Sequence, residues 1–235
     1  MSNGQSWKLA SLLSLAAAVA IGAAAQNPLV EQRLVEIKQA AAANKQALSR
    51  YTWQEKQIVS VNGQVKKESL YQVRLGPNGE QQKTLIMSTP EAAKPGGGPL
   101  RRHIVEKKTG EFEQYAQQVG ALAHSYAQPN PQRLQQAFES GNVALGPSGP
   151  GQFELIVTNY LKPGDSVHYI FSRPQHAIQR VVVSSYLTNP SDAVTMDVQF
   201  AKLPDGTNHV ASTTINGVSK QLVVQDTNSN YVRAA

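Results

Sequence analysis

The chain has 235 residues, no cysteine and a formal net charge of +6 at pH 7. The lack of cysteine excludes disulfide bonds and a lipid anchor on an N-terminal cysteine. The basic residues alternate mostly with Gln, Glu and Ser, whereas nucleic-acid-binding proteins gather them on one element among aromatic side chains. We therefore expect no nucleic-acid partner.

The first 25 residues have the layout of a secretory signal peptide. Lys8 supplies a positive start, an apolar run extends from Leu9 to Ile21, and three alanines end at Ala25. The run is shorter than the roughly 20 apolar residues that a spanning helix needs, although an uncleaved anchor is the alternative. We expect cleavage after Ala25, a periplasmic or secreted protein of residues 26–235, and no transmembrane anchor after cleavage.

A helix and three strands are predicted next. Pro28 suits the first turn of a helix, and the run of alanines at 40–43 favours helix through residues 28–50. Asn62-Gly63 between two alternating segments is a strong hairpin signal. The predicted strands are 51–61, 64–75 and a third near 81–87.

A helical insert is predicted in the middle of the chain. The stretch 88–99 contains Gly96-Gly97-Gly98 and is expected to be a flexible loop. Gly110 and Gly120 are expected to break or bend the helix that follows, and Asn130-Pro131 opens a second helix. The insert therefore covers about residues 100–141, in segments near 100–127 and 130–141.

The last third of the chain is predicted to be almost entirely strand. Turn signals at Pro163-Gly164-Asp165, Asp205-Gly206 and Asn216-Gly217 separate the apolar segments. The predicted strands are 152–161, 166–172, 178–188, 193–202, 207–216 and 219–226.

These elements predict one α+β domain. Short connections between consecutive strands indicate an antiparallel meander, and about nine twisted strands curl instead of staying flat. The helices then cover the apolar face of the sheet. We expect a curved antiparallel sheet or incomplete barrel of about nine strands, with an N-terminal helix and the helical insert as a lid.

This order of elements resembles the LolA/RseB-like lipoprotein-carrier family of the bacterial periplasm, over most of residues 26–235. The shared features are a signal peptide, an N-terminal helix, a few strands, a helical insert and a long meander. The resemblance implies a helical lid over an apolar cavity that binds acyl chains or lipid-modified peptides. The segments 64–69 and 205–208 are also similar to exported bacterial proteins of unknown function.

Patterns typical of catalytic and metal sites are missing from the sequence. The segment 146–150 resembles a nucleophile elbow around Ser148, but Pro150 stands where that motif requires glycine. No His-x3-His pair or phosphate-binding loop occurs. The histidines are scattered, at His103, His124, His168, His176 and His209. We expect neither catalytic residues, metal nor cofactor.

Two sets of apolar residues are candidates for lining a ligand cavity. On the predicted insert they are Phe112, Tyr115, Val119 and Leu122, and on predicted strands Tyr71, Val73, Met196, Val198 and Phe200. The insert residues have an alternative role in ordinary core packing, because amphipathic helices usually bury their apolar stripe. Both roles are compatible if the insert closes on the sheet when empty and moves when loaded, with Gly96-Gly97-Gly98 as its hinge.

Three functions follow as hypotheses. The first is non-enzymatic binding or carriage of a lipid, acyl chain or other amphiphile, since each buried methylene contributes about 0.8 kcal/mol. The second is a cell-envelope protein-interaction module whose core is filled by its own side chains. The third, a hydrolase or other enzyme, would require a polar pocket that gathers His124 or His168 with an acid.

Overall fold

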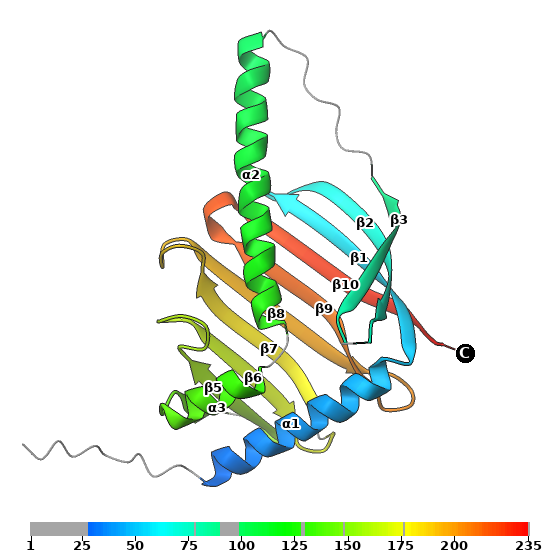
Figure 1. Cartoon of the computed structure of the whole chain (residues 1–235), viewed down its shortest axis with the longest axis vertical. Coiled ribbons are helices and arrows are strands. Elements are labelled where there is room, and N and C mark those ends of the chain that lie inside the picture. Colours follow the sequence, from blue (N-terminus) through cyan, green and yellow to red (C-terminus); the bar gives the residue numbers. More distant parts are fainter. Residues whose placement is uncertain are drawn as a thin grey trace, which may run out of the picture.

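The computed structural model describes residues 28–77, 79–89, 99–127, 130–147, 149–175 and 177–234. The predicted signal peptide and the predicted glycine hinge lie outside these residues. Within them the chain is α+β, with three α-helices and one ten-stranded antiparallel sheet that does not close (Figure 1). The predicted fold class is confirmed.

The helices are α1 (Pro28–Leu48), α2 (Pro99–Tyr126) and α3 (Pro131–Glu139), with a 3-10 turn η1 (Val218–Lys220). The strands are β1 (Tyr51–Val61), β2 (Gln64–Leu75), β3 (Gln81–Ser88), β4 (Val143–Gly146), β5 (Gln152–Thr158), β6 (Ser166–Ser172), β7 (Ala177–Tyr186), β8 (Ala193–Lys202), β9 (Asn208–Gly217) and β10 (Leu222–Arg233). Their order in the sheet is β3-β2-β1-β10-β9-β8-β7-β6-β5-β4. The last strand therefore joins the N-terminal strands to the meander.

Turn chemistry explains the first hairpin but not the last one. Asn62 and Gly63 have φ angles of 52° and 74°, as a two-residue hairpin turn with two left-handed positions requires. Gly217, predicted to form a turn, is instead the last residue of β9, with a φ of −104°. The turn follows in η1 and ends at Gln221, whose φ is 47°.

The helix α2 is continuous through Gly110 and Gly120, so the predicted break at these glycines is wrong. Each glycine costs about 1 kcal/mol relative to alanine inside a helix, which a helix of 28 residues tolerates. Figure 1 shows that the N-terminal part of α2 extends beyond the sheet, whereas its C-terminal part lies over the strands.

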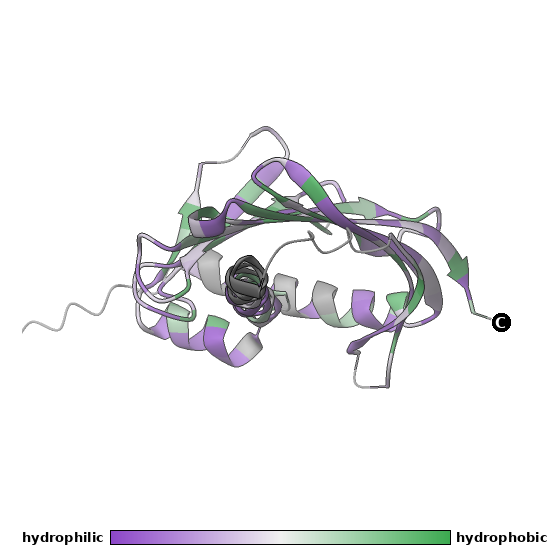
Figure 2. Cartoon of the chain, turned by 90° about the horizontal axis from the view of Figure 1, so that it is seen from above, coloured by the Kyte–Doolittle hydropathy of each residue, from purple (hydrophilic) through white to green (hydrophobic). Residues whose placement is uncertain are grey.

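The sheet is arched, and the three helices lie on its concave side (Figure 2). The face of α2 that packs against the strands presents Tyr115, Val119, Ala123 and Tyr126, at helical spacing. These residues belong to one apolar core with side chains of α3 and β5 to β10. The predicted packing of the insert on the concave face thus holds for α3 and the C-terminal part of α2.

Among the described residues, no helix combines the length and apolar character that crossing a bilayer would require.

Candidate functional site

A row of aliphatic side chains crosses the concave face of the sheet. Its members are paired directly from strand to strand, and directly opposed residues point to the same face. They are Val59, Val224, Ile215, Met196, Val183, Val167, Val157 and Val143, on β1, β10, β9, β8, β7, β6, β5 and β4. Because neighbouring strands are about 4.8 Å apart, this aliphatic row is about 34 Å long.

A second row of side chains lies beside the aliphatic row on the concave face, two residues away along each strand. This level of the sheet changes from apolar to polar at β9. Leu155, Tyr169, Val181 and Val198 are paired in sequence on β5 to β8. The same level continues through Thr213 on β9, Asp226 on β10 and Gln57 on β1. Only the aliphatic row therefore offers an apolar path from β4 to β1 among these two levels.

The middle of α2 approaches the sheet at Gly217. A β-carbon placed there would lie 2.7 Å from Tyr115 Oη and 2.9 Å from Tyr115 Cε1. The absence of a side chain at Gly217 therefore makes room for the tyrosine ring. Tyr115 Oη donates a hydrogen bond of 3.3 Å to Asp192 Oδ1, and Ser219 Oγ donates to the same oxygen. This contact holds α2 beside the loop between β7 and β8.

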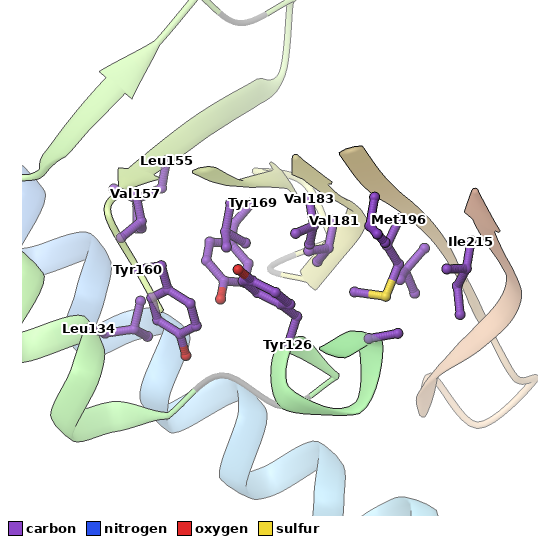
Figure 3. Packing of buried hydrophobic residues seen from close by; sticks show 14 of the residues in the cluster. Tyr126, Leu134, Leu155, Val157, Tyr160, Tyr169, Val181, Val183, Met196 and Ile215 are labelled. Atoms are coloured by element: carbon purple, nitrogen blue, oxygen red, sulfur yellow. The ribbon is translucent and has the colours of Figure 1, made fainter. Parts of the chain in front are cut away.

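The C-terminal end of α2 is held by a buried polar network. Tyr126 Oη lies 2.8 Å from Ser185 Oγ and donates a 2.5 Å hydrogen bond to Asp165 Oδ2. Burial first, and then the hydrogen bond to Asp165, raise the pKa of Tyr126 above its ordinary value, so the hydroxyl keeps its proton. Figure 3 shows Tyr126 beside Tyr160 and Tyr169 between the helices and the sheet.

The structure brings seven of the nine predicted ligand-lining residues together. Tyr115, Val119, Met196 and Val198 are buried in the apolar core, and Phe112, Leu122 and Phe200 pack against it. Tyr71 and Val73 lie elsewhere, on β2, directly opposite Glu55 and Trp53 of β1. Contact of any of these residues with a ligand stays a prediction.

Charged residues on the concave face near β1 were not predicted from the sequence. Glu55 is only 3% exposed and forms a 2.5 Å ion pair with Lys83 of β3. Asp226 accepts a 3.0 Å hydrogen bond from Gln57 Nε2. Burial first, and then the nearby Glu55, raise the pKa of Asp226.

The convex face holds a histidine–carboxylate pair that the scattered histidines did not suggest. His168 Nδ1 lies 2.7 Å from Glu154 Oε1, because β5 and β6 form a hairpin that puts both residues on one face. The predicted turn at 163–165 fixes this register and was the signal that could have revealed the pair.

Glu154 also lines a polar hollow of about 330 Å³, together with Gln152, Gln179, Arg180 and Gln199. The described lining residues include no hydroxyl or thiol that could act as a nucleophile, and Ser148 of the elbow-like segment lies outside the described part of the chain. Nor do the described residues include a group of three or more His, Cys, Asp or Glu placed to hold a metal ion. The charged groups among the described lining residues are therefore the carboxylate of Glu154 and the guanidinium of Arg180, and His168 reaches the hollow only through its contact with Glu154.

A comparison with protein-family models found no match to the sequence. No curated protein matches it either. Among solved structures, the chain is similar to the crystal structure of a DUF1329 family protein from Desulfovibrio piger, with a TM-score of 0.38 and 9% sequence identity. The match covers 88% of this chain and 92% of that chain.

Proposed function

We propose that the protein binds the alkyl or acyl chain of a lipid or other amphiphile along the aliphatic row, with α2 as a movable lid. The observation that supports this most is the row itself, because eight consecutive strands place an aliphatic side chain at one level. A continuous apolar path suits an alkyl chain, and each buried methylene contributes about 0.8 kcal/mol.

The lid role of α2 follows from how it contacts the sheet. Tyr115, Val119 and Ala123 pack into the same apolar core as Met196 and its neighbours. A chain lying along this part of the row would have to replace these contacts, so loading requires α2 to move. The element order that resembles the lipoprotein-carrier family agrees with this mechanism. Carriage within the periplasm is part of the same proposal.

The experiment compares two half-buried valines that are neighbours in β10. Val224 belongs to the aliphatic row, whereas Val223 points to the opposite face. Protein from its native cells is delipidated and titrated with a fluorescent fatty acid, and native mass spectrometry identifies retained lipid. We expect Val224→Asp to weaken binding at least about tenfold, because a carboxylate in an apolar path costs over 1.4 kcal/mol.

Val223→Asp is the matched control and should bind like the wild type, with circular dichroism confirming that both variants fold. A wild-type protein that is repeatedly recovered empty and takes up no fatty acid would refute the proposal. Equal weakening by both substitutions would also refute it, because the effect would then not depend on the face.

A second function, protein interaction at the cell envelope, is favoured by the outermost strand β3. Leu85, Ile86 and Met87 are consecutive and exposed there, and an unprotected edge strand is a template for pairing with another chain. Cross-linking in cells would support this function if one constant partner were captured by the wild type and lost in Ile86→Lys. The experiment would exclude this function if the wild type and Ile86→Lys captured the same proteins.

A further inference from the structure

The aliphatic row ends at a lysine. Val59 of β1 is directly opposite Lys67 of β2, so both residues face the concave side. The alternation along β2 agrees, because Ser69 and Val73, two and six residues further on, are buried. Lys67 is exposed, and among the residues that the structure describes it makes no ion pair. A positive charge therefore stands in line with the apolar path.

The two ends of the row differ. The terminal valines, Val143 and Val59, are both half-buried and both pack against the apolar core. The difference lies beyond them: α1 contacts β4 at one end, whereas the exposed Lys67 follows Val59 at the other. A polar head group that must keep contact with water is better accommodated at the Lys67 end, because burying it without partners costs several kcal/mol.

The other charges of this region do not cancel the charge of Lys67. Lys83 and Glu55 neutralise each other on a different level of the sheet. Lys56 pairs with Glu68 at 3.1 Å, and Glu68 points to the opposite face from Lys67. Asp226 lies on β10, beyond β1, at the level of Gln57 and Ser69.

We propose that the ligand is an anionic amphiphile, whose head group pairs with Lys67 while its chain follows the aliphatic row toward β4. This inference rests on the proposed function and adds the charge and orientation of the ligand. The shared chemistry is a carboxylate or phosphate on a long alkyl chain. A charge-assisted contact at an exposed lysine strengthens binding by about three- to tenfold.

The test uses four probes that share a dodecyl chain: dodecanoate, dodecyl phosphate, dodecanol and dodecylammonium. Each is titrated into the delipidated full chain, below its aggregation concentration, by isothermal calorimetry. We expect at least one of the two anionic probes to bind about three- to tenfold more tightly than dodecanol. This ratio of affinities should decrease as salt is added. The ratio of the two anionic probes distinguishes a carboxylate from a phosphate head group.

Lys67→Met should abolish the preference, measured as the ratio of anionic-probe to dodecanol affinity within the same variant. The matched control is Lys66→Met, since Lys66 is the adjacent exposed residue and its ammonium group donates a hydrogen bond to Gln64 on the same strand. Equal binding of all four probes, tighter binding of dodecylammonium, or the same loss in both variants would overturn the inference while the proposed function stands. Failure of every probe to bind would overturn both.

Discussion

The hydroxyl of Tyr126, the last residue of α2, donates a 2.5 Å hydrogen bond to the carboxylate of Asp165. Asp165 is 1% exposed and also accepts hydrogen bonds from the backbone N–H groups of Tyr160, Leu161 and Lys162. One carboxylate therefore shapes the β5–β6 turn and fixes the C-terminal end of α2. The lid movement proposed for α2 would therefore pivot at this end.

Tyr126→Phe should destabilise the protein by about 1–3 kcal/mol, because it removes the hydroxyl from a buried network and leaves Ser185 without this partner. Urea unfolding at pH 7 measures the change. Tyr186→Phe is the control: its hydroxyl donates to the Pro163 carbonyl at an exposed position, so its loss should cost under about 1 kcal/mol. Equal losses would contradict the anchoring role of Tyr126.

Gly217→Ala should displace Tyr115, because the new methyl group would lie 2.7 Å from Tyr115 Oη. We expect a loss of about 1–3 kcal/mol in the free energy of unfolding, as for other substitutions that overpack a core. Hydrogen exchange of the amides around Tyr115 should become faster, with smaller changes near Tyr126. Unchanged exchange around Tyr115 would show that the ring does not hold α2 to β9.

The control for Gly217 is Gly120→Ala in α2 itself. A β-carbon at Gly120 meets nothing within 4 Å, so the only expected effect is on the helix. Alanine is favoured over glycine inside a helix by about 1 kcal/mol. The variant should therefore be more stable in urea and exchange its α2 amides more slowly, opposite in sign to Gly217→Ala.

Asp226→Asn should increase stability at neutral pH. Burial, and next the charge of Glu55, raise the pKa of Asp226 above its ordinary value of 3.8. The raised pKa means that its stabilising contribution is complete below the unfolded pKa and is lost as the pH rises through the folded pKa. Asparagine stays neutral and can still accept the hydrogen bond from Gln57. Urea unfolding from pH 3 to 7 should show a gain that disappears in acid.

Asp197→Asn should decrease stability at neutral pH, which is the opposite of the effect expected for Asp226→Asn. The hydrogen bonds from Arg180 lower the pKa of Asp197, so its contribution is present above the unfolded pKa and is lost as the pH falls through the folded pKa. The pair is partly exposed, and its loss should cost under about 1 kcal/mol at pH 7. If Asp226→Asn and Asp197→Asn changed stability with the same pH dependence, the raised pKa of Asp226 and the lowered pKa of Asp197 would both be contradicted.

Elements whose signals are local were predicted closely. The strands 51–61, 64–75, 166–172 and 193–202 have the predicted bounds, because alternation and turn residues are read over a few positions. The strand Val143–Gly146 was not predicted. Four residues next to a Gly/Pro run carry too little periodicity, and pairing with β5 makes them a strand.

The candidate site was only partly predictable. The apolar face of the insert around Tyr115 and Val119 follows from helical spacing. The separation of Tyr71 and Val73 from these residues could not be predicted, because the spacing of residues along a strand does not show where that strand lies in the sheet. Gly217 was interpreted as a turn residue, since a sequence does not distinguish a glycine needed for a left-handed φ from one needed for close approach.

The sequence by itself determined the kinds of elements, their order and the face that each strand buries, because hydrogen-bonding geometry and side-chain alternation act between near neighbours. Only the tertiary structure decided that β10 pairs with β1, which brings Val224 beside Val59 across more than 160 residues of chain. It also decided that Lys67 stands in line with the aliphatic row. Such pairings depend on how the whole sheet buries its apolar face, and no local pattern encodes them.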